Sequence, residues 1–253
     1  MNIAAHFAEI DRLKSRLDSL RPLPEHTVRT LHEQQVLEWT YHSNAIEGNT
    51  LTLKETKVVL EGITIGGKPL REHFEVINHK EAIDYVEAIV QNLEALSEWQ
   101  IKSIHRLVLK NIDNRNAGQY RQENVVIAGA EHMPPDYIKV PEAMAGLMEW
   151  YGRSSELHPV ECAARLHVDF VGIHPFVDGN GRTSRLLMNF ELMRRGFLPV
   201  IIPVENRLAY YDALDTAHTR GDYCLFIELV ANLEQATLER YLRIVQGATD
   251  TNR

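Results

Sequence analysis

Cysteines, strand-forming segments and long apolar runs are all scarce in this 253-residue sequence. The two cysteines, Cys162 and Cys224, lie in apolar helical stretches, which fits a reducing compartment better than a disulfide framework. No apolar run approaches the roughly 18 residues of a membrane-spanning helix, and the N-terminus lacks the residue order of a signal peptide. We therefore expect a cytoplasmic protein that does not cross a membrane.

Positive charge is also in short supply. Lysine and arginine number 27 against 35 aspartates and glutamates, which gives a formal net charge of -8. Proteins that bind nucleic acids need a basic face, so the composition argues against a nucleic-acid partner. A few arginines in one pocket can still bind a phosphate group, because a local site does not depend on the net charge.

Helical periodicity dominates the sequence. A first helix should end before Pro22, since proline disfavours helix in the residue before it. A second helix is expected over about 25–48, and Thr52-Leu53-Lys54-Glu55 fits the capping box of a third that ends at Gly62. Further helical patterns cover 72–95, 97–110, 140–152, 158–172, 182–195, 207–219 and 222–246.

The stretch from Gly118 to Val140 breaks this pattern. Its β-branched residues 125–127 are followed by Gly129 and then by Pro134-Pro135, which predicts a short hairpin. Strand patterns are otherwise poor, so a doubly wound α/β fold is disfavoured. The sequence therefore predicts an all-α bundle that carries one short β-hairpin flap.

One segment, GIHPFVDGNGRTSR, gathers groups suited to phosphate chemistry. The loop 178–181 can direct successive N–H groups toward one point, at the start of a helix whose dipole favours anions. Arg182 and Arg185 lie on one face of that helix, and their forked donors suit phosphate oxygens. Asp178 is a hard ligand for Mg²⁺, and His174 can take a proton near neutral pH. A helix–helix turn with a capping aspartate would account for only one or two of these residues.

The run from His174 to Arg185 resembles the signature of Fic-domain proteins, HPFx[D/E]GNGRxxR, at every specified position. The resemblance extends from about Thr40 to Leu242 and is particularly close to the animal endoplasmic-reticulum members, which modify an Hsp70 chaperone. It implies a Fic-fold helical bundle of class II, the class with an N-terminal inhibitory helix. The expected organisation is an N-terminal helix over 1–24 and a Fic domain over 25–253, with the inhibitory helix at about 25–48 and the core at about 97–200.

What the resemblance implies is AMPylation, the transfer of AMP from ATP to a Ser, Thr or Tyr hydroxyl of a target protein with release of pyrophosphate. His174 would be the general base, and Asp178 would hold Mg²⁺. Tyr210 and Tyr211 resemble tyrosines on the adenine side, and the residues expected to bind ATP are Gly179, Asn180, Gly181, Arg182, Arg185, Tyr210 and Tyr211. The flap would pair with the target backbone, with Ile127 and His132 near the hydroxyl. Leu70 matches a region through which relatives dimerise.

Residues 43–48, SNAIEG, resemble the family's inhibitory motif, [S/T]xxxE[G/N]. Ser43 and Glu47 lie one turn apart on one helical face. A glutamate at a helix C-terminus opposes the helix dipole and so needs a partner elsewhere. The resemblance implies that this partner is Arg185, whose pairing with Glu47 would displace the γ-phosphate and inhibit the enzyme in cis.

Two other functions remain open at this point. A phosphodiesterase that removes AMP from the same target would need His174, Asp178 and also Glu47, which would position the attacking water. A permanently inhibited regulator would bind ATP without turnover.

Overall fold

The computed structural model describes residues 3–250, with side chains described up to residue 247. Within residues 3–250 the chain forms ten α-helices and three single 3-10 turns, and no residue is in a β-strand. The all-α prediction is confirmed. None of the described helices is both long and apolar enough to cross a membrane. The α-helices are α1 (Ile3–Ser19), α2 (Glu25–Ile46), α3 (Leu53–Leu60), α4 (Leu70–Gln91), α5 (Glu98–Leu109), α6 (Val140–Arg153), α7 (Pro159–Ile173), α8 (Asn180–Arg194), α9 (Arg207–Arg220) and α10 (Cys224–Asp250).

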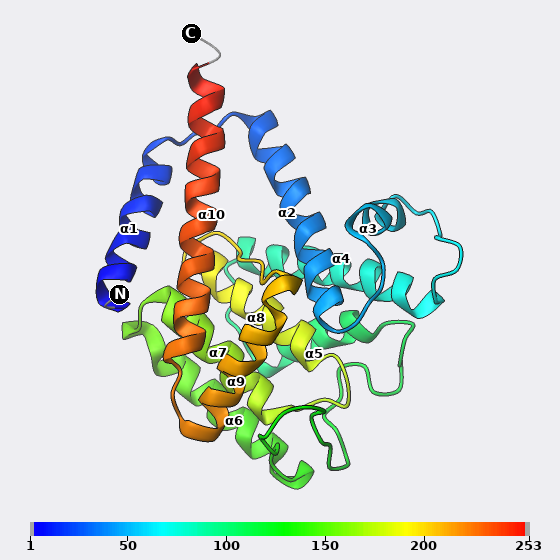
Figure 1. The fold of residues 1–253 in the computed structure, drawn as a ribbon. Helices are drawn as coiled ribbons and strands as arrows, with labels where there is room; N and C mark the ends of the chain where they lie inside the picture. The colour runs from blue at the N-terminus through cyan, green and yellow to red at the C-terminus, as the bar shows by residue number, and fades with distance from the viewer. Residues whose placement is uncertain (1–2, 251–253) are drawn as a thin grey trace.

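Helices α7 and α8 lie near the middle of the fold (Figure 1), and both contribute side chains to two hydrophobic cores. On one side they pack with α1, α9 and α10 around residues such as Ile10, Tyr210 and Phe226. On the other side they pack with α4, α5 and α6 around residues such as Ile104 and Phe170. Because both helices are enclosed, the short connection between them is fixed at both ends.

Helix α8 is buried on every face, although many of its residues are polar. From Asn180 to Leu192 only Gly181 is not classed as buried. Arg182 and Arg185 are each 2% exposed. Burial of charged side chains is costly unless they are paired or bind an ion. The two buried arginines of α8 therefore need negatively charged groups from the protein or from a ligand.

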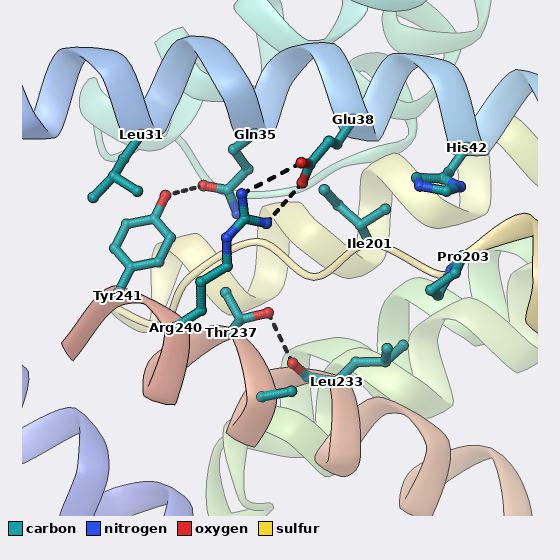
Figure 2. Close-up of a pocket in the computed structure, with 11 residues that line it drawn as sticks. Leu31, Gln35, Glu38, His42, Ile201, Pro203, Leu233, Thr237, Arg240 and Tyr241 are labelled. Carbon is teal, nitrogen blue, oxygen red and sulfur yellow. Dashed lines mark hydrogen bonds and ion pairs between the residues drawn. The ribbon is translucent and has the colours of Figure 1, made fainter. Parts of the chain in front are cut away.

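Helix α2 is attached to α10 by polar contacts at the edge of a small cavity (Figure 2). The Arg240 guanidinium donates to both oxygens of Glu38, at 2.8 and 3.3 Å, and the Tyr241 hydroxyl donates to Gln35. The cavity measures about 200 Å³ and is lined by none of the residues predicted to form the site. These contacts hold α2 in place several turns before its C-terminal end.

The predicted β-hairpin is wrong. Residues 124–127 form no strand, and the return segment contains Pro134 and Pro135, which have no N–H to donate to a ladder. Side chains close the loop instead. Asn124 donates to Asp136 at 3.0 Å and accepts from the Tyr137 amide at 2.9 Å. The flap is therefore an irregular loop over residues 118–136, followed by the 3-10 turn Tyr137–Lys139.

Candidate active site

The connection between α7 and α8 has a tightly defined backbone. His174 ends α7 in the left-handed conformation, with φ 50° and ψ 58°, and Gly179 takes φ 78° immediately before α8. The Asn180 side chain spans the loop: its amide donates to the Phe176 carbonyl at 2.8 Å and its oxygen accepts from the Phe176 amide at 3.0 Å. Asn180 was predicted to bind ATP, but its side chain is used to hold the loop in shape.

The N-terminus of α8 is open to an anion. No side chain caps it at Gly179, so the first-turn N–H groups that a helix cannot satisfy internally face the loop. Gly181 lies beside the Glu47 carboxylate: a Cβ on Gly181 would come within 2.3 Å of Glu47 Oε1. Glycine at this position therefore leaves room for one negatively charged group against the helix end.

Arg185 is surrounded by partners from α2 and α9. Its guanidinium donates to Glu47 Oε1 at 2.7 Å, to the Ser43 carbonyl at 2.8 Å and to the Ser43 hydroxyl at 3.0 Å. A further N–H reaches the Tyr210 hydroxyl at 3.3 Å. The expected contact between Glu47 and Arg185 is thus confirmed, and Ser43 joins it as the one-turn spacing predicts.

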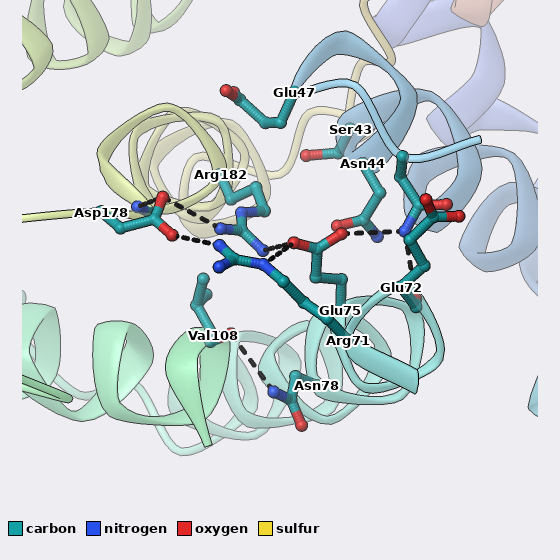
Figure 3. A network of polar contacts seen from close by, with 12 residues as sticks. Ser43, Asn44, Glu47, Arg71, Glu72, Glu75, Asn78, Val108, Asp178 and Arg182 are labelled. Carbon is teal, nitrogen blue, oxygen red and sulfur yellow. Dashed lines mark hydrogen bonds and ion pairs between the residues drawn. The ribbon is translucent and has the colours of Figure 1, made fainter. Parts of the chain in front are cut away.

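Arg182 has a much poorer set of partners (Figure 3). One N–H reaches Asp178 Oδ1 at 3.3 Å, and Glu75 Oε1 lies 3.6 Å from another terminal nitrogen. Its Nε and Nη1 are buried without a hydrogen-bond partner. Buried donors of this kind are expensive unless a ligand satisfies them, so Arg182 is suited to bind an anion.

Asp178 lies at the mouth of the same site. Its Oδ1 accepts from the Gly179 amide at 2.6 Å, and Arg71 at the start of α4 donates to Oδ2 at 2.6 Å. Burial alone would raise the pKa of Asp178, but the nearby Arg182 and Arg71 cations bring that pKa below its ordinary value. The side chain is 43% exposed, so an ionised carboxylate faces solvent beside the anion site.

His174 is neutral at physiological pH. Burial lowers the pKa of its imidazole to about 4. The backbone carbonyl of His174 accepts from Arg121 at 2.9 Å, and Arg121 also donates to Glu123 and Pro135 in the flap. Arg121 was not predicted. It ties the flap to the loop before α8, and its position among other polar residues of the flap gives no sequence signal for this role.

His105 in α5 was also missed. It is fully buried and stacks on Phe176 with ring centroids 3.6 Å apart. Its Nε2 donates to the Asp178 carbonyl at 2.8 Å, while its Nδ1 accepts from the Gly118 amide at 2.9 Å. A neutral imidazole thereby fixes both the start of the flap and the loop before α8. A lone histidine in an apolar helix gives no sequence signal for such a role.

The flap residues lie over α7 and α9. His132 Nε2 donates to the Gly172 carbonyl at 2.9 Å, and its ring faces that of His218 at 4.5 Å. A cleft of about 490 Å³ opens beside this pair. Ile127 is half-buried in the flap, and a turn places its carbonyl 3.2 Å from the Ala130 amide.

The two tyrosines of α9 occupy different environments. Tyr210 is 1% exposed, and its hydroxyl lies between Arg185 and His167, where burial raises the pKa of the phenol to about 12. Tyr211 is 36% exposed and donates to the Ile46 carbonyl at 3.3 Å. Tyr210 therefore supports Arg185, whereas Tyr211 is accessible to a ligand; an adenine contact stays a prediction for both.

Residues 95–192 of the chain match the Fic/DOC family. Over 243 residues the chain is 40% identical to a protein adenylyltransferase Fic of Drosophila persimilis, a match that covers 92% of this chain and 46% of that protein. The chain spans about half the length of the curated relatives it resembles.

Solved structures give the same result. A Fic domain-containing signaling protein from Bacteroides thetaiotaomicron is 30% identical, with a TM-score of 0.87 over 94% of this chain and 97% of that one. Fic-1 of C. elegans is 35% identical, with a TM-score of 0.85 over 99% of this chain and 74% of that one. With the fold, the loop and the signature residues all in agreement, the chain belongs to the Fic/DOC family.

Proposed function

We propose that this protein transfers AMP from ATP to a hydroxyl group of a target protein. The observation that carries the proposal is the position of a neutral histidine, His174, beside an open helix N-terminus with two buried arginines. The relatives named protein adenylyltransferases support this choice of reaction and of a protein as the target.

His174 would act as the general base. Its neutral imidazole accepts the proton of the incoming Ser, Thr or Tyr hydroxyl, and the hydroxyl oxygen forms a bond to the α-phosphorus of ATP. The bond between the α-phosphorus and the bridging oxygen breaks, and pyrophosphate leaves. Fixing His174 at the end of α7 aligns base and phosphate before the reaction, which is where positioning lowers the barrier.

The remaining residues would bind the phosphates. The unpaired donors of Arg182 and the first-turn amides of α8 provide charge stabilisation at the α- and β-phosphates. One ionised carboxylate beside a phosphate site is an arrangement that suits Mg²⁺, which usually takes its other ligands from phosphates and water. Asp178 would hold the ion, which neutralises phosphate charge when bound.

Glu47 would inhibit this reaction from within the same chain. Its carboxylate and a γ-phosphate are both anions that Arg185 can bind, and the two cannot occupy the same guanidinium face. ATP would then bind in an unproductive pose until Glu47 moves away. Because α2 supplies Glu47, no separate inhibitory protein is required for this effect.

The test is incorporation of labelled AMP from ATP and Mg²⁺, measured for the wild-type protein and for Glu47→Gly. We expect Glu47→Gly to raise transfer, including modification of the enzyme itself, by at least about tenfold, which corresponds to about 1.4 kcal/mol. Equal activity of the two proteins would mean that Glu47 is not inhibitory. Nucleotide binding without turnover in both would favour the permanently inhibited regulator.

Removal of AMP from a modified target is a second candidate. It is favoured by the location of the Glu47 carboxylate, which lies against Gly181 and near enough to influence the pKa of His174. In this reaction Glu47 would orient the attacking water. The same Glu47→Gly variant should therefore lose AMP removal while it gains AMP transfer.

A homodimer through the region of Leu70 is also proposed. Leu70 opens α4 and is 62% exposed, so its side chain is accessible to a second copy of the chain. Sedimentation of Leu70→Asp provides the test: the variant should be a folded monomer, and an unchanged mass would count against this interface.

A further inference from the structure

Both oxygens of Asp178 are already held by cations. Arg182 approaches Oδ1 from α8, and Arg71 approaches Oδ2 from the start of α4, at 2.6 Å (Figure 3). The two arginines differ in their freedom. The Arg182 side chain is 3% exposed, whereas that of Arg71 is 57% exposed and also contacts Glu75 Oε1 at 3.1 Å.

Arg71 and a metal ion compete for the same oxygen. Mg²⁺ binds carboxylate oxygens at about 2.0–2.1 Å, which would bring a divalent cation directly against the Arg71 guanidinium. Repulsion between these charges requires Arg71 to leave Oδ2 when the metal enters. The displaced guanidinium of Arg71 can still donate from its Nε to Glu75.

We propose that Arg71 is the counter-ion of Asp178 in the metal-free protein, and that its displacement sets the Mg²⁺ concentration at which nucleotide binds productively. Arg71 is thus a positioning residue, since it acts through Asp178. The inference rests on the proposed function, because it requires a metal-bound nucleotide at this carboxylate.

Two other roles for Arg71 make different electrostatic predictions. A counter-ion that is removed leaves Asp178 more negative, so metal-bound nucleotide should bind more tightly and metal-free nucleotide more weakly. A direct phosphate ligand that is removed should weaken both. A purely structural ion pair should alter neither. The sign of the change with and without metal therefore distinguishes the three.

The experiment measures binding of a non-hydrolysable ATP analogue by calorimetry, in EDTA and across a series of Mg²⁺ concentrations. For Arg71→Gln we expect the Mg²⁺ concentration for half-maximal effect to fall about two- to fivefold, in the range of a partly exposed ion pair. Binding in EDTA should weaken by a similar factor. Arg71→Lys retains the charge and should stay near the wild type.

Lys80→Gln is the matched control, because it removes another ion pair of α4, with Asp84, away from the site. It should leave both affinities unchanged, and thermal unfolding of each protein without ligand checks that all are folded. If Mg²⁺ changes nucleotide affinity in the wild type, but Arg71→Gln leaves both affinities unchanged or weakens both equally, this inference alone is overturned. If Mg²⁺ has no more effect on nucleotide affinity in the wild type than in Asp178→Asn, the metal site of the proposed function is overturned as well.

Discussion

Arg182 and Arg185 lie one turn apart on the same face of α8, and both are almost completely buried, yet their surroundings differ sharply. Arg185 donates to Ser43, Glu47 and Tyr210, which come from two other helices. Arg182 leaves two nitrogens without a hydrogen-bond partner, and its two carboxylate contacts are long, at 3.3 Å to Asp178 and 3.6 Å to Glu75. The anion site therefore has one part that is filled by the protein and one part that is left for a ligand.

This difference indicates where regulation acts. The Glu47 side chain that fills the Arg185 part can be withdrawn, whereas Nε and Nη1 of Arg182 form no hydrogen bond that a ligand would have to break. Binding and reaction should then respond separately to mutation, and the predictions below test that separation.

The largest expected effect comes from His174→Ala. The His174 side chain forms no hydrogen bond with either arginine, so nucleotide binding should persist. AMP transfer should fall by about 10²–10⁴-fold, the usual cost of losing a general base. The measurement pairs labelled AMP incorporation in the Glu47→Gly background with nucleotide binding by calorimetry. Transfer within tenfold of the parent would remove His174 from the mechanism.

Acid should destabilise the protein through His105, which holds the start of the flap and the loop before α8. Burial lowers the pKa of His105 to about 4, against about 6.5 in an unfolded chain. The resulting stability is complete above pH 6.5 and is lost as the pH falls toward 4, because the unfolded state then binds the proton first.

At pH 5 this histidine alone should lower the free energy of unfolding by about 2 kcal/mol relative to neutral pH. Urea unfolding of the wild type and of His105→Gln at both pH values isolates its share, since an amide can keep a donor and an acceptor but does not titrate. Parallel pH dependence in the two proteins would assign the effect to other groups.

The sequence predicted helices and local motifs well, because these depend on near neighbours. The capping box of Thr52 and Glu55 is present, and α2 ends within two residues of the expected stop. It failed where distant side chains decide the structure. Arg121 holds the flap by donating to backbone carbonyls, where the sequence predicted hydrogen bonds between strands. Arg71 contacts Asp178, which lies 107 residues further along the chain. No periodicity or spacing encodes contacts of this kind.

The third prediction combines Glu47→Gly with Arg185→Ala. The first change empties the Arg185 part of the site, and the second removes the guanidinium that would bind the γ-phosphate there. The roughly tenfold gain of Glu47→Gly should therefore be lost. Labelled AMP incorporation compares the double variant with both single variants. If the double variant kept the full gain, Arg185 would have no part in productive nucleotide binding.

The smallest effect is expected from loosening α2 at a distance from its inhibitory end. Arg240 holds α2 through Glu38, and the Arg240 side chain is 47% exposed, so the pair should contribute about 0.2–1 kcal/mol. In Arg240→Gln the helix is held less firmly, and Glu47 should leave Arg185 more often. AMP transfer should rise, but by less than about fivefold.

Two comparisons make this small change interpretable. Arg153→Gln removes a more exposed ion pair, with Glu149 on α6, and should leave transfer unchanged because α6 does not contact Glu47. Arg240→Gln added to Glu47→Gly should give no further gain, since the carboxylate that α2 delivers is already absent. A gain that persists in that double variant would mean that Arg240 affects catalysis by a route other than Glu47. Helix α2 connects the Arg240–Glu38 contact with the Glu47–Arg185 contact. Inhibition by Glu47 within the chain therefore requires that Arg240→Gln give no further gain once Glu47 is absent.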